Sequence, residues 1–385
     1  MDFQLNEQQE MIRDMARKFA DERIAPMADK TDKEHRFPAE IIEEMGEMGL
    51  MGVAVPEEYG GAGMGYVEYV LAMEEISRAC ASTGVIMSVN NSLVCDPILK
   101  FGTEEQKKKY LVPLASGKKL GAFSLSESGA GSDAAAVSCR AREDGDSFVL
   151  NGTKLWCTNG NEADVVILFA STDPDKGSHG ISAFLIEKGT PGFSVGKLED
   201  KLGIRGSSTA EFVLEDCRIP KENMLGERGK GYKIALITLD GGRIGIAAQA
   251  LGIGKAALDA ARKFAQERQQ FGKPISSFQA IQWMLANMAT ELECARLLTY
   301  EAASLKDAGR PFTIYSAMCK LKASETASFC ANKALQIHGG YGYTTDYPVE
   351  RHLRDAKITE IYEGTNEIQR LVVATLVLKG LHGKG

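Results

Sequence analysis

The C-terminal part of the chain contains three long amphipathic segments, and they constrain the fold more than any other feature of the sequence. They cover residues 232–268, 277–307 and 313–337. The breaks between them, Gly272-Lys273-Pro274 and Gly309-Arg310-Pro311, contain the two residue types that interrupt helices most strongly. Helical patterns longer than about 25 residues need a partner surface along their apolar face. The sequence therefore predicts a bundle of packed helices.

Residues 121–230 follow a different pattern, in which short apolar runs alternate with turn residues. Asn151-Gly152, directly after one of these runs, is typical of a β-hairpin turn. No helical pattern comes between the runs, so the sequence predicts a small antiparallel β-domain of sandwich or barrel type. The expected strands cover residues 120–125, 147–150, 165–170, 181–186 and 210–214.

The first 120 residues are predicted to be helical. Asn6 followed by Gln9 has the pattern of a capping box, in which each side chain bonds the backbone N–H of the other residue. Apolar residues then recur at helical spacing from Ile12 to Phe19. We therefore expect an α+β protein, mainly α, with three domains: an N-terminal helical domain at 1–120, a middle antiparallel β-domain at 121–230 and a C-terminal helix bundle at 231–385.

Composition and charge exclude several classes of function. The formal net charge of −7 argues against a general nucleic-acid surface. No continuous apolar run approaches the roughly 20 residues that cross a bilayer, so no membrane insertion is expected. No secretory signal or transit pattern is seen, the eight cysteines include no Cys-x-x-Cys pair, and the histidines lack metal-ligand spacing. These features predict a cytoplasmic, bacterial protein with reduced thiols and no metal site.

The stretch from Ile361 to Glu367 holds the main candidate for acid–base chemistry. Glu363 lies there between Tyr362 and Gly364. In a water-poor aromatic setting the charged form of a carboxylate is disfavoured, so its pKa rises and it becomes a better base near neutrality. Taken alone, these residues favour a solvated glutamate at a helix edge, because Glu is rarely buried without a partner.

Two segments of the β-domain combine small residues with groups that could bind a ligand. Residues 126–133 offer backbone N–H groups and hydroxyls for a phosphate or pyrophosphate, or they form a plain tight loop. Trp156, with the hydroxyl of Thr158 nearby, could stack on a flat heterocycle and bond to it, or Trp156 could belong to the core. The local residues leave both choices open.

Three further candidates lie in the helical C-terminal part. Arg268 at a helix end could pair with a phosphate or bridge to acidic neighbours on the surface. Residues 336–343, with three glycines among aromatic residues, could approach a ligand or form a helix C-cap and loop. Arg243 lies in an early turn of the first long helix, where a surface role is the default.

In this order along the chain, these segments closely resemble the acyl-CoA dehydrogenase family, in particular its short-chain or butyryl-CoA branch. The resemblance extends from Glu7 to Gln369. It implies a helical N-terminal domain, a β middle domain and a C-terminal four-helix bundle. It also implies that Glu363 removes the α-proton of an acyl-CoA while flavin N5 of FAD accepts hydride from the β-carbon. The product would be a trans-2-enoyl-CoA, and the electrons would pass to an electron-transfer flavoprotein.

The resemblance also assigns roles to residues that match the family's motifs. The enolate oxygen would be held by the backbone N–H of Glu363 and a ribityl hydroxyl of FAD. The implied acyl-CoA contacts are Ser132, Asp240, Arg243 and Gly364. The implied FAD contacts are Phe123, Leu125, Ser126, Ser132, Trp156, Thr158, Arg268, Phe271, Gln279, Gln336, Gly340, Thr365 and Glu367. The five from Arg268 to Gly340 would reach the FAD of a neighbouring subunit, which implies a homotetramer built as a dimer of dimers.

Departures from relatives bear on the substrate. Some relatives carry their base on the first long helix, where this chain has Gly241 and Gly242, so Glu363 has no rival. Relatives that bind a dicarboxylate carry an arginine shortly before a Met-Ser-Val sequence. Here no cation comes shortly before Met87-Ser88-Val89, so a dicarboxylate substrate is not expected. Ser128 stands where many relatives have proline, a change that a loop tolerates.

Several alternatives stay open at this point. The substrate could be a branched or cyclic acyl-CoA, since one residue in the pocket, within about 85–100 or 240–255, can decide chain length. The enzyme could be an acyl-CoA oxidase that passes electrons to O2. Two rivals are not enzymes: a flavin- or CoA-binding module without chemistry, and a purely structural helical protein.

Overall fold

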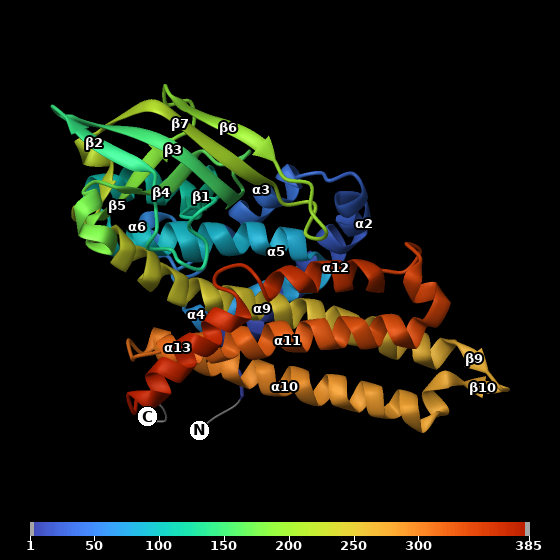
Figure 1. Cartoon of the computed structure of the whole chain (residues 1–385). Helices are drawn as coiled ribbons and strands as arrows, with labels where there is room; N and C mark the ends of the chain where they lie inside the picture. Colours follow the sequence, from blue (N-terminus) through green and yellow to red (C-terminus); the bar gives the residue numbers. More distant parts are fainter. Residues whose placement is uncertain (1–3, 382–385) are drawn as a thin grey trace.

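The computed structural model describes residues 4–381. The predicted domain ranges also include residues 1–3 and 382–385, which lie outside the described part. Helices at both ends of the chain lie on one side of a twisted sheet formed by its middle part (Figure 1). The predicted order of helical, β and helical parts is confirmed.

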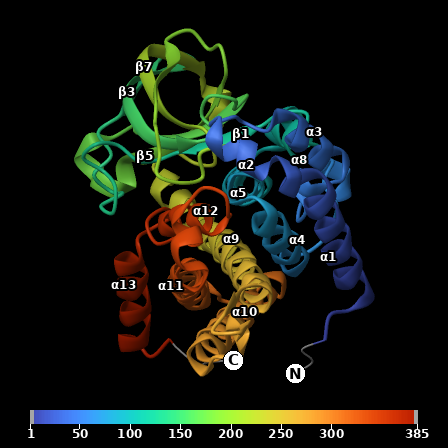
Figure 2. The same ribbon diagram turned by 90° about the vertical axis from the view of Figure 1, so that its right-hand side faces the viewer.

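The N-terminal part is helical throughout. Asn6 caps the first helix as predicted, since its Oδ1 accepts from Gln9 N at 2.9 Å and its own N–H donates to Gln9 Oε1 at 3.1 Å. Every residue of α5 and of the π-helical stretch Val89–Cys95 is buried, and together they contact both the sheet and α9 (Figure 2). The helices are α1 (Glu7–Phe19), α2 (Ala25–Lys33), α3 (Ala39–Glu47), α4 (Tyr66–Ala79), α5 (Ala81–Ser88), α6 (Asp96–Phe101), α7 (Glu104–Gln106) and α8 (Val112–Ala115).

The middle part is an eight-stranded sheet in the order β6-β7-β3-β2-β4-β5-β8, with β1 beside β4. Most pairs are antiparallel as predicted; besides one parallel bridge between β2 and β4, strands β1 and β4 are parallel, with Gly121 opposite Val165. The chain crosses through β2 and β3 between these two strands, a connection long enough for parallel pairing. The strands are β1 (Gly121–Ser124), β2 (Arg140–Asp144), β3 (Ser147–Thr158), β4 (Val165–Ser171), β5 (Ile181–Glu187), β6 (Phe193–Leu198), β7 (Thr209–Pro220) and β8 (Met224–Leu225).

The predicted hairpin turn at Asn151-Gly152 is wrong. Strand β3 runs through these residues with a shift of register against β7. Gly152 has φ +143°, and a Cβ there would lie 2.9 Å from Cys139 Cα. The turn lies six residues earlier, at Gly145-Asp146, where Asp144 pairs with Ser147 and Gly145 has φ +59°. A glycine required for unusual backbone geometry fits a bulge as well as a turn.

The C-terminal part packs three long helices together, and two shorter ones pack on α11. Helix α9 also contacts α4 of the N-terminal part, so it lies at the centre of the molecule (Figure 2). A Cβ at Gly252 would lie 2.5 Å from Glu74 O, so this close approach of α4 and α9 requires glycine. The elements are α9 (Gly231–Glu267), β9 (Gln269–Gln270), β10 (Lys273–Pro274), α10 (Gln279–Asp307), α11 (Thr313–His338), α12 (Val349–Thr359) and α13 (Asn366–Leu378).

By length and composition α9 is long and apolar enough to cross a bilayer, although it contains no continuous run of about 20 apolar residues. Glycine and alanine make its average hydropathy high without giving a continuous run of large apolar residues. The relevant stretch is 78% buried inside the protein. It is therefore the core helix of the bundle.

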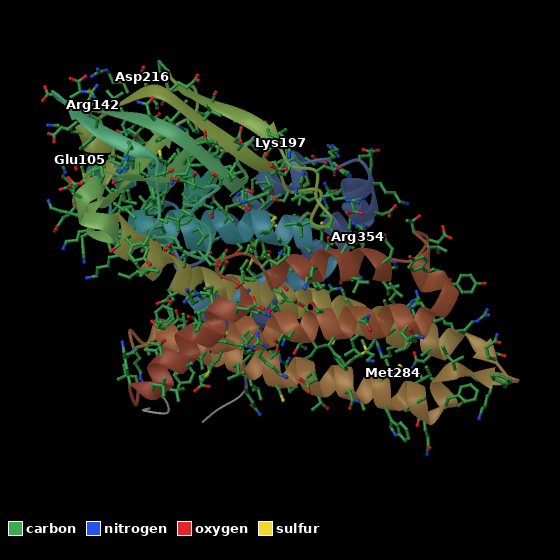
Figure 3. All side chains as sticks on the ribbon, viewed as in Figure 1. Glu105, Arg142, Lys197, Asp216, Met284 and Arg354 are labelled. Atoms are coloured by element: carbon green, nitrogen blue, oxygen red, sulfur yellow. The ribbon has the colours of Figure 1, made fainter. Side chains whose placement is uncertain are left out.

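The connection between β6 and β7 joins all three parts of the chain. Ile204 N donates to Asp355 Oδ1 of α12 at 2.6 Å, and Gly206 N donates to Ser82 Oγ of α5 at 3.2 Å. Arg354 of α12, labelled in Figure 3, bonds Leu202 O at 3.1 Å and the carboxylate of Asp32. The helix that precedes Glu363 is thus fixed to both other parts.

Candidate active site

Glu363 lies in the loop between α12 and α13, and its carboxylate faces α9 at Gly242. A Cβ at Gly242 would overlap Oε2 of Glu363 and lie 2.7 Å from Cδ2 of Leu93. The carboxylate therefore occupies the space that a side chain at Gly242 would fill.

One oxygen of this carboxylate is shielded from water, while the residue as a whole is half-buried. Oε2 of Glu363 is buried and has no hydrogen-bond partner among the described residues. Burial raises the pKa of Glu363 to about 8, although the nearby cations Lys320 and Arg243 oppose the rise. The alternative of a solvated helix-edge glutamate does not fit this geometry.

The backbone of the loop has an unusual conformation. Glu363 has φ +53° and Gly364 has φ +89°, both in the left-handed region that non-glycine residues seldom adopt. The hydroxyl of Tyr362 donates to Gln249 Oε1, and Gln249 Nε2 donates to Ala81 O at 2.9 Å, which ties the loop to α9 and α5. Backbone strain of this kind persists only where surrounding contacts enforce it, and it is frequent at functional sites.

Two buried side chains donate hydrogen bonds to the backbone of the loop. Gln369 Nε2 donates to Gly364 O at 2.9 Å, and so does Lys320 Nζ at 2.9 Å. Sequence reasoning missed Lys320, Gln249 and Gln369. A lysine at a buried position of a helical pattern is the one signal that could have found Lys320.

Arg243 and Asp240, which flank Gly241 and Gly242 on α9, form a largely buried ion pair. Arg243 is only 5% exposed, so its default surface role is wrong. Its Nη1 donates to Asp240 Oδ1 at 2.6 Å, and Thr313 Oγ1 donates to Asp240 Oδ2 at 2.7 Å. Arg243 Nε is buried without a partner among the described residues. Burial raises the pKa of Asp240, and the cation of Arg243 opposes that rise.

The predicted flavin residues of the β-domain lie on two adjoining segments. Phe123 lies in β1 beside Phe169, with ring centroids 5.0 Å apart, and residues 125–126 directly follow this strand. Leu155 N donates to Ser126 O at 2.9 Å, which joins this segment to β3. Trp156 on β3 has φ +62° and is 60% exposed, so it is not a core tryptophan. Thr158 is half-buried on the same strand, and Ser132 lies in the exposed loop beyond.

A buried ion pair fixes this loop from inside. Lys154 Nζ lies 2.7 Å from Glu127 Oε1 and donates to Leu125 O at 3.0 Å. Glu127 also accepts from Ser138 N at 2.7 Å and from Cys139 N at 3.1 Å. Glu127 lies within residues 126–133 and Lys154 lies two positions before Trp156, but nothing in the local sequence indicates that these two residues form an ion pair.

Five other predicted cofactor residues lie away from Glu363 in this chain. They lie where α9 meets α10 and where α11 ends, at the far end of the bundle from α13 (Figure 1). Phe271 is 92% exposed there, and the guanidinium of Arg268 lies 5.3 Å from the ring centroid of Tyr341. The group comprises Arg268, Phe271, Gln279, Gln336 and Gly340. Thr365 and Glu367, by contrast, begin α13 next to Glu363, where Thr365 Oγ1 accepts from Ile368 N at 3.3 Å.

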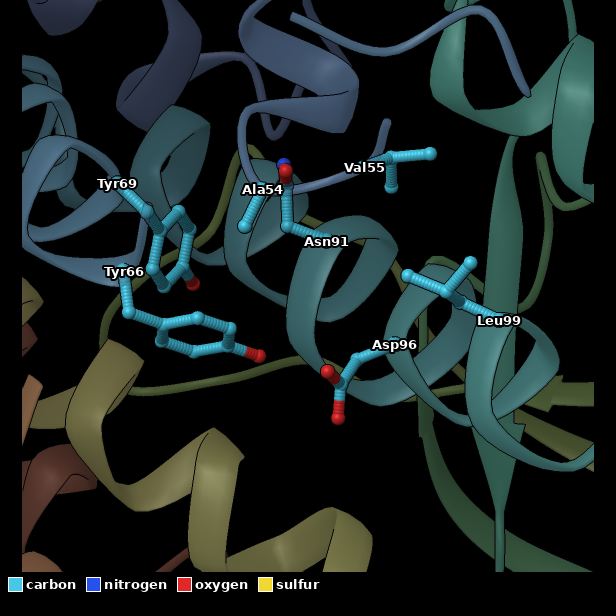
Figure 4. A pocket seen from close by; sticks show the side chains of 7 residues that line it. All are labelled: Ala54, Val55, Tyr66, Tyr69, Asn91, Asp96 and Leu99. Carbon is cyan, nitrogen blue, oxygen red and sulfur yellow. The ribbon is translucent and has the colours of Figure 1, made fainter. Parts of the chain in front are cut away.

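A small polar cavity lies between α4, the π-helical stretch and α6 (Figure 4). Tyr66, Tyr69, Asn91 and Asp96 contribute its polar groups. The buried Lys306 Nζ lies 3.4 Å from Asp96 Oδ1, and a Cβ at Gly241 would lie 2.5 Å from that nitrogen. Successive glycines of α9 therefore face a buried cation and the Glu363 carboxylate. No group of three or more possible metal ligands occurs in the described part of the chain.

The chain matches three family models along most of its length. They are the N-terminal, middle and C-terminal domains of acyl-CoA dehydrogenase, matched at residues 6–118, 122–217 and 229–378. The mitochondrial short-chain specific acyl-CoA dehydrogenase of Bos taurus is 59% identical over 98% of this chain and 91% of its own length.

Two solved structures are similar throughout. Butyryl-CoA dehydrogenase from Megasphaera elsdenii has a TM-score of 0.97 at 48% identity, covering 98% of this chain and 100% of its own. A chain from the structure of the electron transferring flavoprotein of Acidaminococcus fermentans has a TM-score of 0.98 at 54% identity, with the same coverage. The resemblance found in the sequence is confirmed: the chain belongs to the acyl-CoA dehydrogenase family.

Proposed function

We propose that this chain is an FAD-dependent short-chain acyl-CoA dehydrogenase in which Glu363 is the catalytic base. The buried Oε2 of Glu363, without a protein partner and facing a glycine of α9, is the observation that carries the proposal. Family membership supplies the reaction class, which removes hydrogen from the α- and β-carbons of an acyl-CoA and gives a trans-2-enoyl-CoA.

The environment of Glu363 suits the removal of a weakly acidic proton. An α-proton beside a thioester is a weak acid, so the base must be stronger than a solvated carboxylate. A pKa of about 8 meets this demand near neutral pH. The absence of a side chain at Gly242 leaves room for the reacting carbon beside the carboxylate.

The proposed oxyanion contact is also available. The N–H of Glu363 donates no hydrogen bond among the described residues. A backbone N–H at this place is able to bond the thioester oxygen as negative charge develops on it. The left-handed backbone, held by Tyr362 and Gln249, keeps that N–H and the carboxylate in one fixed arrangement.

The β-domain residues fit FAD. The exposed indole of Trp156 offers an apolar face to a flat ring, and the hydroxyls of Ser126 and Thr158 are hydrogen-bonding groups on the adjoining segments. The buried Lys154–Glu127 pair keeps the loop that carries Ser126 in place. When bound, FAD supplies the acceptor for the hydride that leaves the β-carbon.

Bulky side chains close the space beyond Glu363, which supports a short acyl chain. Leu93 lies against Gly242, and a Cβ at Gly245 would lie 2.6 Å from both Ser88 Oγ and Tyr69 OH. The hydroxyl of Tyr69 donates to Ser88 Oγ at 3.1 Å, so these polar groups are already paired across the helices. A longer chain would have to displace this packed group.

The proposed assembly is a dimer of dimers that passes electrons to an electron-transfer flavoprotein in the cytoplasm. Large apolar side chains exposed around α10 support contacts between subunits, since Phe271 is 92% and Trp283 63% exposed. All eight cysteines are free thiols, which supports a reducing compartment.

The direct test is the substitution Glu363→Gln. The variant should keep its yellow FAD, because Glu363 is not needed to hold the ring, but butyryl-CoA should no longer bleach the flavin in the absence of oxygen. The matched control Glu43→Gln, at an exposed position of α3, should bleach at the rate of the unmodified enzyme. Substantial bleaching by Glu363→Gln would remove this residue from the role of base.

Two measurements separate the remaining alternatives. A bleaching series over acyl-CoAs of increasing length, with branched and cyclic members, should give the fastest reaction with a short straight chain. A faster reaction with a branched or cyclic acyl group would overturn the proposed substrate. Hydrogen peroxide formed at the rate of substrate loss would indicate an oxidase.

A further inference from the structure

Lys320 of α11 is a buried lysine that the proposed chemistry has not yet used. Its side chain is fully buried. Its Nζ donates to Gly364 O at 2.9 Å and to Asn366 Oδ1 at 3.0 Å, so both direct partners belong to the loop and helix start that follow Glu363. Lysine is almost never fully buried without a compensating charge.

The direct partners of Lys320 are neutral. Among the described residues its ammonium group forms no ion pair with a carboxylate, and Asn366 Oδ1 already accepts from Ser324 Oγ at 3.0 Å. Gly364 O likewise already accepts from Gln369 Nε2 at 2.9 Å. A neutral donor would therefore be sufficient for the geometry of the loop, and the positive charge requires another explanation.

We propose that Lys320 is a positioning residue for the base: its buried ammonium group fixes the loop that carries Glu363 and stabilises the carboxylate form of that residue. This inference rests on the proposed role of Glu363. The bond to Gly364 O restrains the peptide directly after Glu363, where two consecutive residues have positive φ. A fixed cation near a dry carboxylate lowers the cost of its charge.

The other charged groups around the loop leave Lys320 as the main uncompensated cation. Arg243 of α9 is paired with Asp240, which offsets its charge. Glu360, before the loop, is paired with Lys357 of α12, and Glu367 of α13 is exposed. Tyr69 of α4 and Tyr362 of the loop also face Glu363, but burial raises the pKa of both phenols, so they stay neutral.

Burial lowers the pKa of Lys320 below its usual value, and the negative charge of Glu363 opposes that shift. The protonation states of the two groups are therefore coupled: the ammonium form of Lys320 stabilises the carboxylate form of Glu363, and the reverse also holds. Loss of the cation should raise the pKa of the base. At a pH below that new pKa a smaller fraction of the base is ionised, so the rate of proton removal falls and recovers as the pH rises.

The test uses Lys320→Gln in the FAD-loaded enzyme, with the rate of anaerobic bleaching by butyryl-CoA measured from pH 6 to 10. We expect the variant to keep its flavin and to bleach about tenfold more slowly at pH 7, with an apparent pKa raised by about one unit. The matched control is Lys322→Gln on the same helix, whose lysine pairs with Glu291 away from the loop. Its pH profile should be that of the unmodified enzyme.

A second variant keeps the lysine and its bond. Asn366→Asp places a carboxylate against Lys320 and offsets its charge, so it should raise the apparent pKa in the same direction even if Lys320→Gln fails to fold. If both variants have unshifted pH profiles while Glu363→Gln is inactive in the same assay, the proposed role of Lys320 is wrong and that of Glu363 stands. Bleaching by Glu363→Gln would overturn this inference together with the proposed base.

Discussion

At the scale of single residues, the site depends on one glycine as much as on the glutamate that faces it. Gly242 provides no chemistry, yet its missing side chain makes the space in which Oε2 of Glu363 lies. The position of Glu363 is enforced from the other side by its left-handed backbone and by the bond from Tyr362 to Gln249. The carboxylate thus has little freedom to move aside.

Gly242→Ala tests this fit. The added methyl group would overlap Oε2 of Glu363 and crowd Leu93, so the carboxylate must shift. A displacement of about 1 Å costs on the order of 100-fold in rate, and we expect a loss of that size in flavin bleaching by butyryl-CoA. The flavin content should be unchanged, because a methyl group at Gly242 would meet Glu363 and Leu93 and none of the proposed flavin residues of the β-domain.

Gly254→Ala on the same helix is the control. Its methyl group would meet the end of the flexible Leu292 side chain, 2.7 Å away, and no residue of the proposed site. A bleaching rate for Gly242→Ala equal to that of this control would show that the position of the carboxylate does not depend on Gly242.

At the scale of elements, a buried charged network joins α1, α4 and α9. Glu75 of α4 is 1% exposed and accepts from Arg17 at 2.8 Å, from Arg78 at 2.8 Å and from Lys255 at 2.6 Å. Burial alone would raise the pKa of Glu75, but the three cations outweigh it and lower the pKa to about 2. This network fixes the N-terminal helices to the core helix on which Gly242 lies.

Glu75→Gln should lower the free energy of unfolding by about 3 kcal/mol at pH 7, because it leaves three cations without their shared carboxylate. The folded pKa of Glu75 lies below its ordinary value of 4.5, so the stabilisation is present above about pH 4.5 and is lost as the pH falls towards 2. Urea denaturation should therefore show a difference between variant and unmodified protein that shrinks on acidification. A difference independent of pH would contradict the network's role.

At the scale of the whole molecule, the connection between β6 and β7 and the exposed end of the bundle have opposite roles. The connection bonds α5 and α12, and Arg354 of α12 bonds Asp32 of α2, so the three parts of one chain are held together. The exposed end carries Phe271 and the other predicted residues that reach a neighbouring subunit. The first makes the chain one body, and the second is proposed to join chains.

Phe271→Asp should weaken the proposed tetramer. A charge at this exposed aromatic position would be buried in a subunit contact, at a cost of several kcal/mol. Light scattering should give four times the 41.7 kDa chain mass for the unmodified protein and a smaller mass for the variant, which should also lose FAD on dilution. Met11→Ser, at an exposed position of α1, should stay tetrameric. A tetrameric Phe271→Asp variant with full FAD would argue against this contact.

Local patterns in the sequence are sufficient for the order of helical and β parts, because periodicity depends on neighbours a few residues apart. The capping box at Asn6 and the breaks between the long helices have this local origin and are confirmed. The same locality explains the error at Asn151-Gly152, where a glycine with φ +143° serves a bulge in a continuous strand. Local residues do not distinguish the two uses.

By itself, the sequence determined the family, the order of the domains and Glu363 as the candidate base. Only the tertiary structure decided that one oxygen of its carboxylate is buried without a partner, that Gly242 makes its space and that Arg243 is buried. It also brought Lys320 under the loop from a helix more than 40 positions earlier. The physical reason is that burial and charge environment depend on which distant elements pack together, and no pattern among neighbouring residues contains that information.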